Sequence, residues 1–64
     1  MYFSDYLKKC REKYQLTQED LAIALSHFDR ELFGSLDNVT LSRWELGKSN
    51  PNAARQVQVI KYFQ

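Results

Sequence analysis

Apolar residues recur at helical spacing through the first fourteen positions of the chain, and charged residues fill the positions between them. This pattern predicts an amphipathic first helix, with Ser4 as its N-cap or with a slightly earlier start. Cys10 belongs to the apolar stripe, so we interpret it as a small core residue rather than as a nucleophile. The stripe consists of Phe3, Tyr6, Leu7, Cys10 and Tyr14.

A second helix is predicted from about residue 18 to residue 26. Thr17 is a good N-cap, and Asp20, three residues later, completes a shortened capping box. Glu19 and Asp20 also place negative charge at the positive end of the helix dipole. The residues expected to face inward are Leu21, Ala22 and Leu25.

Residues 27–36 mix bulky apolar side chains with charged ones, and Gly34 and Ser35 interrupt them. The segment is too apolar for a free loop, so we expect it to fold back onto the core as a short helical turn. Its apolar side chains are Phe28, Leu32, Phe33 and Leu36.

A third helix is predicted to begin at Asp37 or Asn38, either of which can serve as the N-cap, and to extend to about Leu46. Gly47 follows directly and can adopt the left-handed conformation that ends many helices. The residues expected to face the core are Leu41 and Trp44.

A fourth helix is predicted to reach the C-terminus. Its N-cap is Asn52, or Asn50 with Pro51 at the first helical position. The residues expected on its inner face are Ala53, Ala54, Val57 and Ile60.

Further apolar residues near the C-terminus widen this stripe beyond what one small core needs. We interpret them as the interface of a homodimer or as a docking surface. Because the surplus ends abruptly, it is also consistent with residues 1–64 being the N-terminal part of a longer protein. These residues are Val59, Tyr62 and Phe63.

The length and composition predict one globular domain. Its 64 residues, 44% hydrophobic and 14% aromatic, allow a single compact core but leave it near the lower size limit for independent folding. No apolar run approaches the roughly 20 residues of a membrane span, and no signal peptide is evident. A single cysteine cannot form an internal disulfide, which favours a reducing compartment. We therefore expect an all-α bundle of four main helices in the cytoplasm, with no membrane association.

The net charge of +1 is unevenly distributed along the chain. Residues 1–16 carry a net charge of +2, residues 17–42 carry −4 and residues 43–64 carry +3. The sequence pI of about 7.9 is below the value of about 9 that marks a strong electrostatic footprint for nucleic acid. We expect one copy of the chain to attract phosphate groups only modestly.

No residues in the chain support catalysis or metal binding. His27 is the only histidine, and we interpret it as a surface or packing residue because no cysteine lies near it. The sequence contains neither a glycine-rich phosphate loop nor a credible catalytic triad. We expect no enzymatic activity, no cofactor, no metal and no small-molecule substrate.

The second and third predicted helices are short, and Trp44 anchors the later one, so the pair can form a helix-turn-helix. Two segments around this pair carry ordered motifs, namely residues 16–22, Leu-Thr-Gln-Glu-Asp-Leu-Ala, and residues 41–48, Leu-Ser-Arg-Trp-Glu-Leu-Gly-Lys. Together with Leu7, Arg11 and Pro51, they resemble the Cro/phage-repressor-type (lambda-repressor-like) helix-turn-helix domains over nearly the whole chain. The connection between the two helices is about nine residues longer than is usual in that family, as it also is in the related POU-specific domains.

The resemblance implies contacts to the DNA backbone. Gln18 matches a glutamine that opens the second helix and hydrogen-bonds a phosphate, often assisted by the residue that matches Thr17. The N–H groups of a helix N-terminus favour an anion in any case. Lys48 matches a position near the backbone. The alternatives are that Thr17 only caps the helix and that Gln18 and Lys48 are solvated.

The resemblance also implies base contacts from the third helix. Asn can pair with adenine, Arg with guanine, and Val or a Thr methyl group can touch the methyl group of thymine. For Asn38 the alternative is a pure N-cap, and for Arg43 a solvated surface charge. The matching positions are Asn38, Val39 and Arg43, with Thr40 and Ser42 nearby on the side expected to be exposed.

Arg11 and Glu45 match a family pair that bridges the first and third helices. A guanidinium fork suits a carboxylate, and a partly buried pair of this kind would fix how the third helix docks.

The resemblance thus implies sequence-specific binding of double-stranded DNA by a transcriptional regulator, repressor-like and active as a homodimer, without catalysis. The alternative is a protein-interaction module on the same scaffold, such as an antitoxin-type partner-binding domain, which the acidic middle and the apolar insertion favour.

Overall fold

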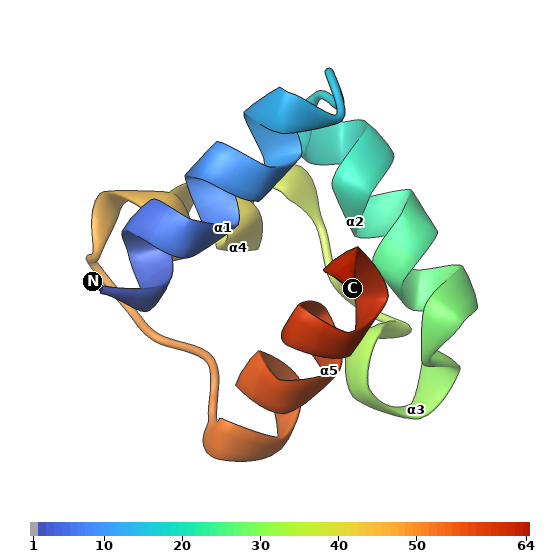
Figure 1. The fold of residues 1–64 in the computed structure, drawn as a ribbon. Coiled ribbons are helices and arrows are strands. Elements are labelled where there is room, and N and C mark those ends of the chain that lie inside the picture. Colours follow the sequence, from blue (N-terminus) through green and yellow to red (C-terminus); the bar gives the residue numbers. More distant parts are fainter. Residues whose placement is uncertain (1) are drawn as a thin grey trace.

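Helices alone make up the secondary structure of residues 2–64, the part of the chain described by a computed structural model. They are α1 (Phe3–Lys13), α2 (Gln18–Phe28), α3 (Arg30–Phe33), α4 (Asn38–Leu46) and α5 (Ala53–Phe63). In Figure 1, α5 packs against both α1 and α2, and α4 lies behind α1 and also contacts α2. The predicted all-α class is confirmed. The helical turn expected within residues 27–36 is the one-turn helix α3.

Side-chain caps fix where α2 and α3 begin. The predicted capping box is present: the Asp20 amide donates to Thr17 Oγ1 at 3.0 Å, and the Thr17 amide donates to Asp20 Oδ2 at 3.3 Å. α2 continues to Phe28, two residues beyond its predicted end. Asp29 then accepts from the amide of Leu32 at 3.1 Å. This second cap lets α3 begin directly after α2 ends.

α1 has the slightly earlier of the two predicted starts. Its N-cap is Tyr2, which makes no side-chain capping bond, and Ser4 lies inside the helix. The two positions left open for the later helices are resolved by hydrogen bonds. Asp37 caps α4 by accepting from the Thr40 amide at 2.9 Å, so Asn38 is the first helical residue. Asn52, not Asn50, caps α5.

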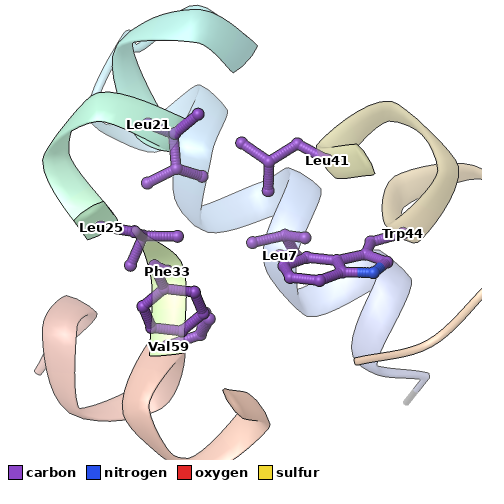
Figure 2. Close-up of a cluster of buried hydrophobic side chains, with 8 residues drawn as sticks. Leu7, Leu21, Leu25, Phe33, Leu41, Trp44 and Val59 are labelled. Atoms are coloured by element: carbon purple, nitrogen blue, oxygen red, sulfur yellow. The ribbon is translucent and has the colours of Figure 1, made fainter. Parts of the chain in front are cut away.

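The hydrophobic core lies where α1, α2, α4 and α5 meet, and α3 closes one end of it (Figure 2). The predicted inward residues of α2 and α4 are all buried, Trp44 retaining only 6% exposure. Phe33 of α3 is 1% exposed, so the segment between α2 and α4 supplies a central core side chain. The core consists of Leu7, Leu21, Ala22, Leu25, Phe33, Leu41, Trp44 and Val59.

The predicted inner face of α5 is wrong. Val59, expected in the surplus stripe, is fully buried, and Tyr62 and Phe63 pack against the core. Val57 and Ile60, expected inside, are 49% and 37% exposed. Ala53 and Ala54 are also exposed. Both stripes have helical spacing, but the one with two aromatic rings removes more apolar surface from water, and this stripe faces the core.

The end of α4 is a left-handed turn, as predicted. Gly47 has a φ of 74°, and the amides of Gly47 and Lys48 donate to Trp44 O and Arg43 O at 3.3 and 3.0 Å. A side chain at this φ would be strained, so glycine suits the abrupt stop. Within residues 2–64, no helix has the length and apolar character needed to cross a membrane.

Candidate nucleic-acid interface

An ion pair between α1 and α4 lies at the centre of the candidate site. The motif resemblance implied this pair. Arg11 Nε donates to Glu45 Oε2 at 2.6 Å, and Arg11 Nη2 donates to Glu45 Oε1 at 3.0 Å. Only 15% of the Arg11 side chain and 4% of the Glu45 side chain are exposed. The hydrogen bond and charge of Glu45 raise the pKa of Arg11. Because the pair is bidentate, it fixes the relative orientation of the two side chains as well as the distance between them.

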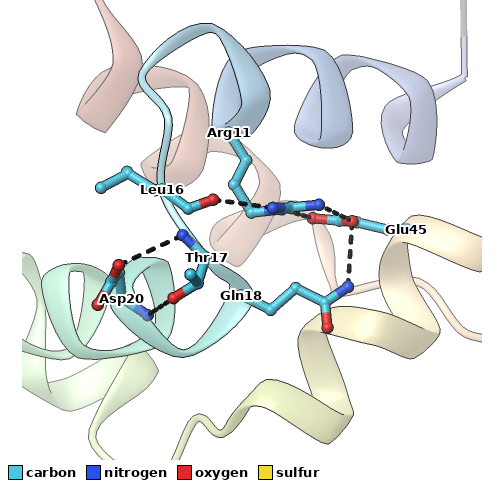
Figure 3. A network of polar contacts seen from close by, with 6 residues as sticks. All are labelled: Arg11, Leu16, Thr17, Gln18, Asp20 and Glu45. Carbon is cyan, nitrogen blue, oxygen red and sulfur yellow. Dashed lines mark hydrogen bonds and ion pairs between the residues drawn. The ribbon is translucent and has the colours of Figure 1, made fainter.

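Two further hydrogen bonds extend this ion pair into a network that also holds the start of α2 (Figure 3). Arg11 Nη1 donates to the carbonyl of Leu16 at 2.8 Å, and Gln18 Nε2 donates to Glu45 Oε1 at 3.2 Å. Glu45 therefore accepts from both α1 and α2. The network therefore holds α4 at a fixed position relative to the N-terminus of α2.

The outer face of α4 is an arc of side chains that point away from the core. At 3.6 residues per turn, five of its residues fall within about 140° of one another, opposite Trp44. All are exposed except Ser42, which is half-buried. No acidic side chain lies on this arc. Its members, which we call the α4 arc, are Asn38, Val39, Ser42, Arg43 and Leu46.

Thr40 does not belong to the α4 arc, contrary to the expectation that it lies on the exposed side. It is half-buried and lines a groove together with Trp44 and Pro51. The reason is helical geometry, since Thr40 is about 100° beyond Val39 around the axis, on the flank that turns toward α5. Leu46, which motif matching did not single out, is 66% exposed on the arc.

The side chains expected at the DNA backbone have different surroundings. Lys48 is exposed just beyond the end of α4. Thr17 is exposed and caps α2, whereas Gln18 is half-buried and directs its amide nitrogen toward Glu45. Glu19 and Asp20, both exposed, place negative charge at the same end of α2. Of these positions, Lys48 is therefore the one that offers an exposed positive charge.

Asp37 contributes negative charge at the first turn of α4. Hydrogen bonds from the backbone amide and the side chain of Thr40, together with the charge of Arg43, lower the pKa of its carboxyl group. The ionised cap is therefore preferred in the folded state, and the stabilisation it brings is present above the ordinary aspartate pKa of about 3.9. It is lost as the pH falls through the lower pKa of the folded state.

Asp37→Asn provides a test of this cap, because asparagine caps a helix almost as well but does not titrate. We expect the melting temperature of the native chain to fall relative to that of Asp37→Asn between pH 7 and about pH 3. Thermal unfolding followed by circular dichroism at both pH values measures the difference. A difference in melting temperature between the two proteins that does not change with pH would contradict this role of the carboxylate.

Two polar contacts between α3 and α5 were not predicted. Arg55 Nε donates to the carbonyl of Leu32 at 2.9 Å, and Gln58 Nε2 donates to Asp29 Oδ2 at 2.8 Å. Asp29 thus caps α3 and also accepts a hydrogen bond from α5. The bonds from Gln58 and from the Leu32 amide both lower the pKa of the Asp29 carboxyl group, with the Gln58 bond contributing most. Periodicity carries no signal for such contacts, because they depend on where α3 packs.

The remaining reactive side chains form no site of their own. Cys10 is a free, half-buried thiol on α1, and His27 is exposed on the last turn of α2. Within the described part of the chain, no three His, Cys, Asp or Glu residues are grouped closely enough to hold a metal ion.

Comparisons with known proteins provide no assignment. The chain matches no protein-family model, no curated protein and no solved structure.

Proposed function

We propose that this chain is a DNA-binding domain of a cytoplasmic transcriptional regulator, without catalytic activity, in which α2 and α4 form a helix-turn-helix. In this proposal α4 enters the major groove of double-stranded DNA and reads its sequence. The observation that carries it is the α4 arc, which is exposed while Glu45, next to the arc on α4, holds this helix to α1 and α2. The motif resemblance to Cro/phage-repressor-type domains supports the same function.

The chemistry of the α4 arc suits base recognition. Arg43 is exposed and can donate two parallel hydrogen bonds to guanine O6 and N7, and Asn38 can pair with adenine N6 and N7. Because Asp37, not Asn38, caps α4, the Asn38 side chain is not used as a cap. Val39, which is 51% exposed, can contact the methyl group of thymine.

The backbone contacts in this proposal come from Lys48 and from the start of α2. Lys48 follows α4 and is exposed, so it can approach a phosphate as a point charge. At α2, the helix N-terminus itself favours an anion. Gln18 can donate to a phosphate through its second amide hydrogen, the one that does not point at Glu45. The Thr17 hydroxyl can donate to a phosphate while its oxygen accepts from the Asp20 amide.

Two cationic side chains near the interface should behave differently when truncated. Arg43→Ala is expected to cost roughly 1–3 kcal/mol of affinity on the preferred site and little on random DNA, because a base contact carries sequence information. Lys48→Ala should weaken binding to all duplexes by a similar factor. It should also reduce the slope of log affinity against log salt by about one. Fluorescence anisotropy with specific and random duplexes at several salt concentrations measures both effects.

Lys61→Ala is the matched control, because Lys61 is an exposed cation on α5, away from the α4 arc. Lys61→Ala should change neither the preference for specific over random DNA nor the slope of log affinity against log salt. If Arg43→Ala instead weakens specific and random DNA equally, Arg43 contacts phosphate and the assignment of base contacts to α4 fails. Gln18→Ala is a poorer probe of phosphate contact, since it also removes the bond to Glu45.

A single α4 arc can read only a few base pairs, so we propose that the chain acts as a homodimer on a palindromic site. Tyr62 and Phe63 belong largely to the core, and the exposed apolar side chains of α5 are instead Val57 and Ile60. Tyr2, which is 80% exposed, lines a groove with Ile60. Ile60→Glu should therefore lower the dimer fraction, and sedimentation of both proteins over a range of concentrations measures it.

A protein-interaction module is the second candidate function, favoured by one observation. Val39 and Leu46 leave two large apolar side chains, 51% and 66% exposed, on the same arc. Such a pair suits the apolar centre of a protein interface better than it suits a phosphate-lined groove. Gel-shift assays of the isolated domain separate the two functions, because only the DNA-binding domain would shift duplexes.

A further inference from the structure

A groove of about 300 Å³ lies between α4 and the start of α5. One wall comes from the chain just before α4 and from α4 itself. The other comes from the segment that follows α4 and from the first turn of α5. Its volume is at the lower end of the range of about 300–1,000 Å³ found for small-molecule sites. It is separate from the α4 arc.

The floor of the groove is apolar. Trp44 and Leu36 line it from one side and Pro51, which is buried, from the other. The nitrogen-bearing edge of Trp44 points away from the other labelled core side chains (Figure 2), and the 6% of Trp44 that stays exposed contributes to the groove. A flat apolar group of modest size can pack on such a floor.

The rim of the groove is polar and has a positive charge. Thr40, Asn50 and Asn52 provide hydroxyl and amide groups, and Arg55 is the only ionisable residue among the lining residues. Arg55 donates through Nε to the Leu32 carbonyl. The ion pair found in the described residues does not involve Arg55, so its two terminal nitrogens have no carboxylate partner there. No acidic residue occupies the first turn of α5 either.

We propose that this groove binds a small organic anion, namely a carboxylate attached to a flat apolar body. The body packs on Trp44 and Pro51. The carboxylate accepts from the terminal nitrogens of Arg55, whose fork geometry matches it, and from the amide groups at the rim. The ligand bridges the segments before and after α4, so it would bias the position of that helix. This consequence for DNA binding rests on the proposed function, whereas the site itself does not.

The chain carries its own reporter of binding, since Trp44 is its only tryptophan. We would titrate the 64-residue chain, without DNA, with phenylacetate, with its neutral analogue phenylacetamide and with inorganic phosphate, following Trp44 fluorescence. Phenylacetate should bind with a Kd on the order of 1 mM. The amide should bind at least about tenfold more weakly, because it lacks the charge that Arg55 recognises.

Variants locate the site and keep the test decisive. Arg55→Gln should abolish the preference for phenylacetate over the amide. Because Arg55 also holds α3, Asn50→Asp is the second variant: Asn50 is exposed and makes no capping bond, and a negative charge there should weaken phenylacetate binding about tenfold. Arg43→Gln, which removes an exposed cation outside the groove, should leave binding unchanged.

Four results would overturn the proposal. Equal binding of phenylacetate and phenylacetamide would mean an apolar groove without anion recognition. Phosphate binding as tight as that of phenylacetate would mean a phosphate site, such as one for a nucleic-acid backbone. No fluorescence change with any probe, or unchanged binding in Asn50→Asp, would mean no site here. Because DNA is absent from this experiment, each result leaves the proposed function untouched.

Discussion

Phe33→Ala is expected to lower the free energy of unfolding by about 3–5 kcal/mol. Phe33 is 1% exposed and is among the largest fully buried side chains, so its removal leaves a cavity that only the collapse of α3 could fill. The stability of a natural domain is only about 5–15 kcal/mol, and a small domain lies near the lower end. We therefore expect a partly unfolded variant, as measured by urea titration with circular dichroism.

Phe28→Ala is the matched control for this prediction. Phe28 lies at the end of α2, is 46% exposed and contacts only the edge of the Tyr62 ring among the aromatic residues described. Its truncation should cost about 1 kcal/mol. Similar losses for the two variants would show that the segment between α2 and α4 is an appendage rather than part of the core.

Glu45→Ala is expected to destabilise the fold by about 3 kcal/mol. The substitution leaves Arg11, only 15% exposed, without its carboxylate partner, and it removes the acceptor of Gln18 Nε2. The double variant Arg11→Met with Glu45→Leu should recover much of this loss, because apolar side chains of similar volume can replace a buried pair. Urea titrations of the native chain, of Arg11→Met and Glu45→Leu singly and of the double variant form the required cycle.

The exposed Glu12 supplies the control for Glu45. It lies one residue from Arg11 on α1 but outside the network, so Glu12→Ala should change the free energy of unfolding by less than about 0.5 kcal/mol. If Glu45→Ala were as mild as Glu12→Ala, the network would not hold α4, and the orientation of the α4 arc would need another explanation.

Local rules predicted much of this fold. The capping box of Thr17, the left-handed Gly47 and the first residue of α4 depend on side chains within a few residues, which the sequence displays directly. Leu21 and Leu25 of α2 and Leu41 of α4 lie on the apolar stripes of their helices, so their burial followed from periodicity. The exposed positions of Asn38 and Arg43 are the complement of that stripe.

Features that depend on packing between distant segments were not predictable in the same way. α5 has two apolar stripes, and only the position of the helix against α1 and α2 decides that Val59 and not Ile60 is buried. The bond from Gln18 to Glu45 joins residues on different helices, and periodicity cannot specify it. The pairing of Arg11 with Glu45 was expected from a motif resemblance and not from spacing.

Selection of bound duplexes from a random-sequence pool tests DNA binding through α4 most directly. The 64-residue chain would be used both alone and fused to a dimerising helix, at about 50 mM salt, where phosphate contacts contribute most. Sequence-specific binding predicts enrichment of one motif, palindromic for the dimeric form, with one base pair relaxed when Arg43→Ala replaces the native chain. If neither form enriches any motif while both remain folded, the chain is not a sequence-specific DNA-binding domain, and the exposed Val39 and Leu46 belong to a protein interface instead.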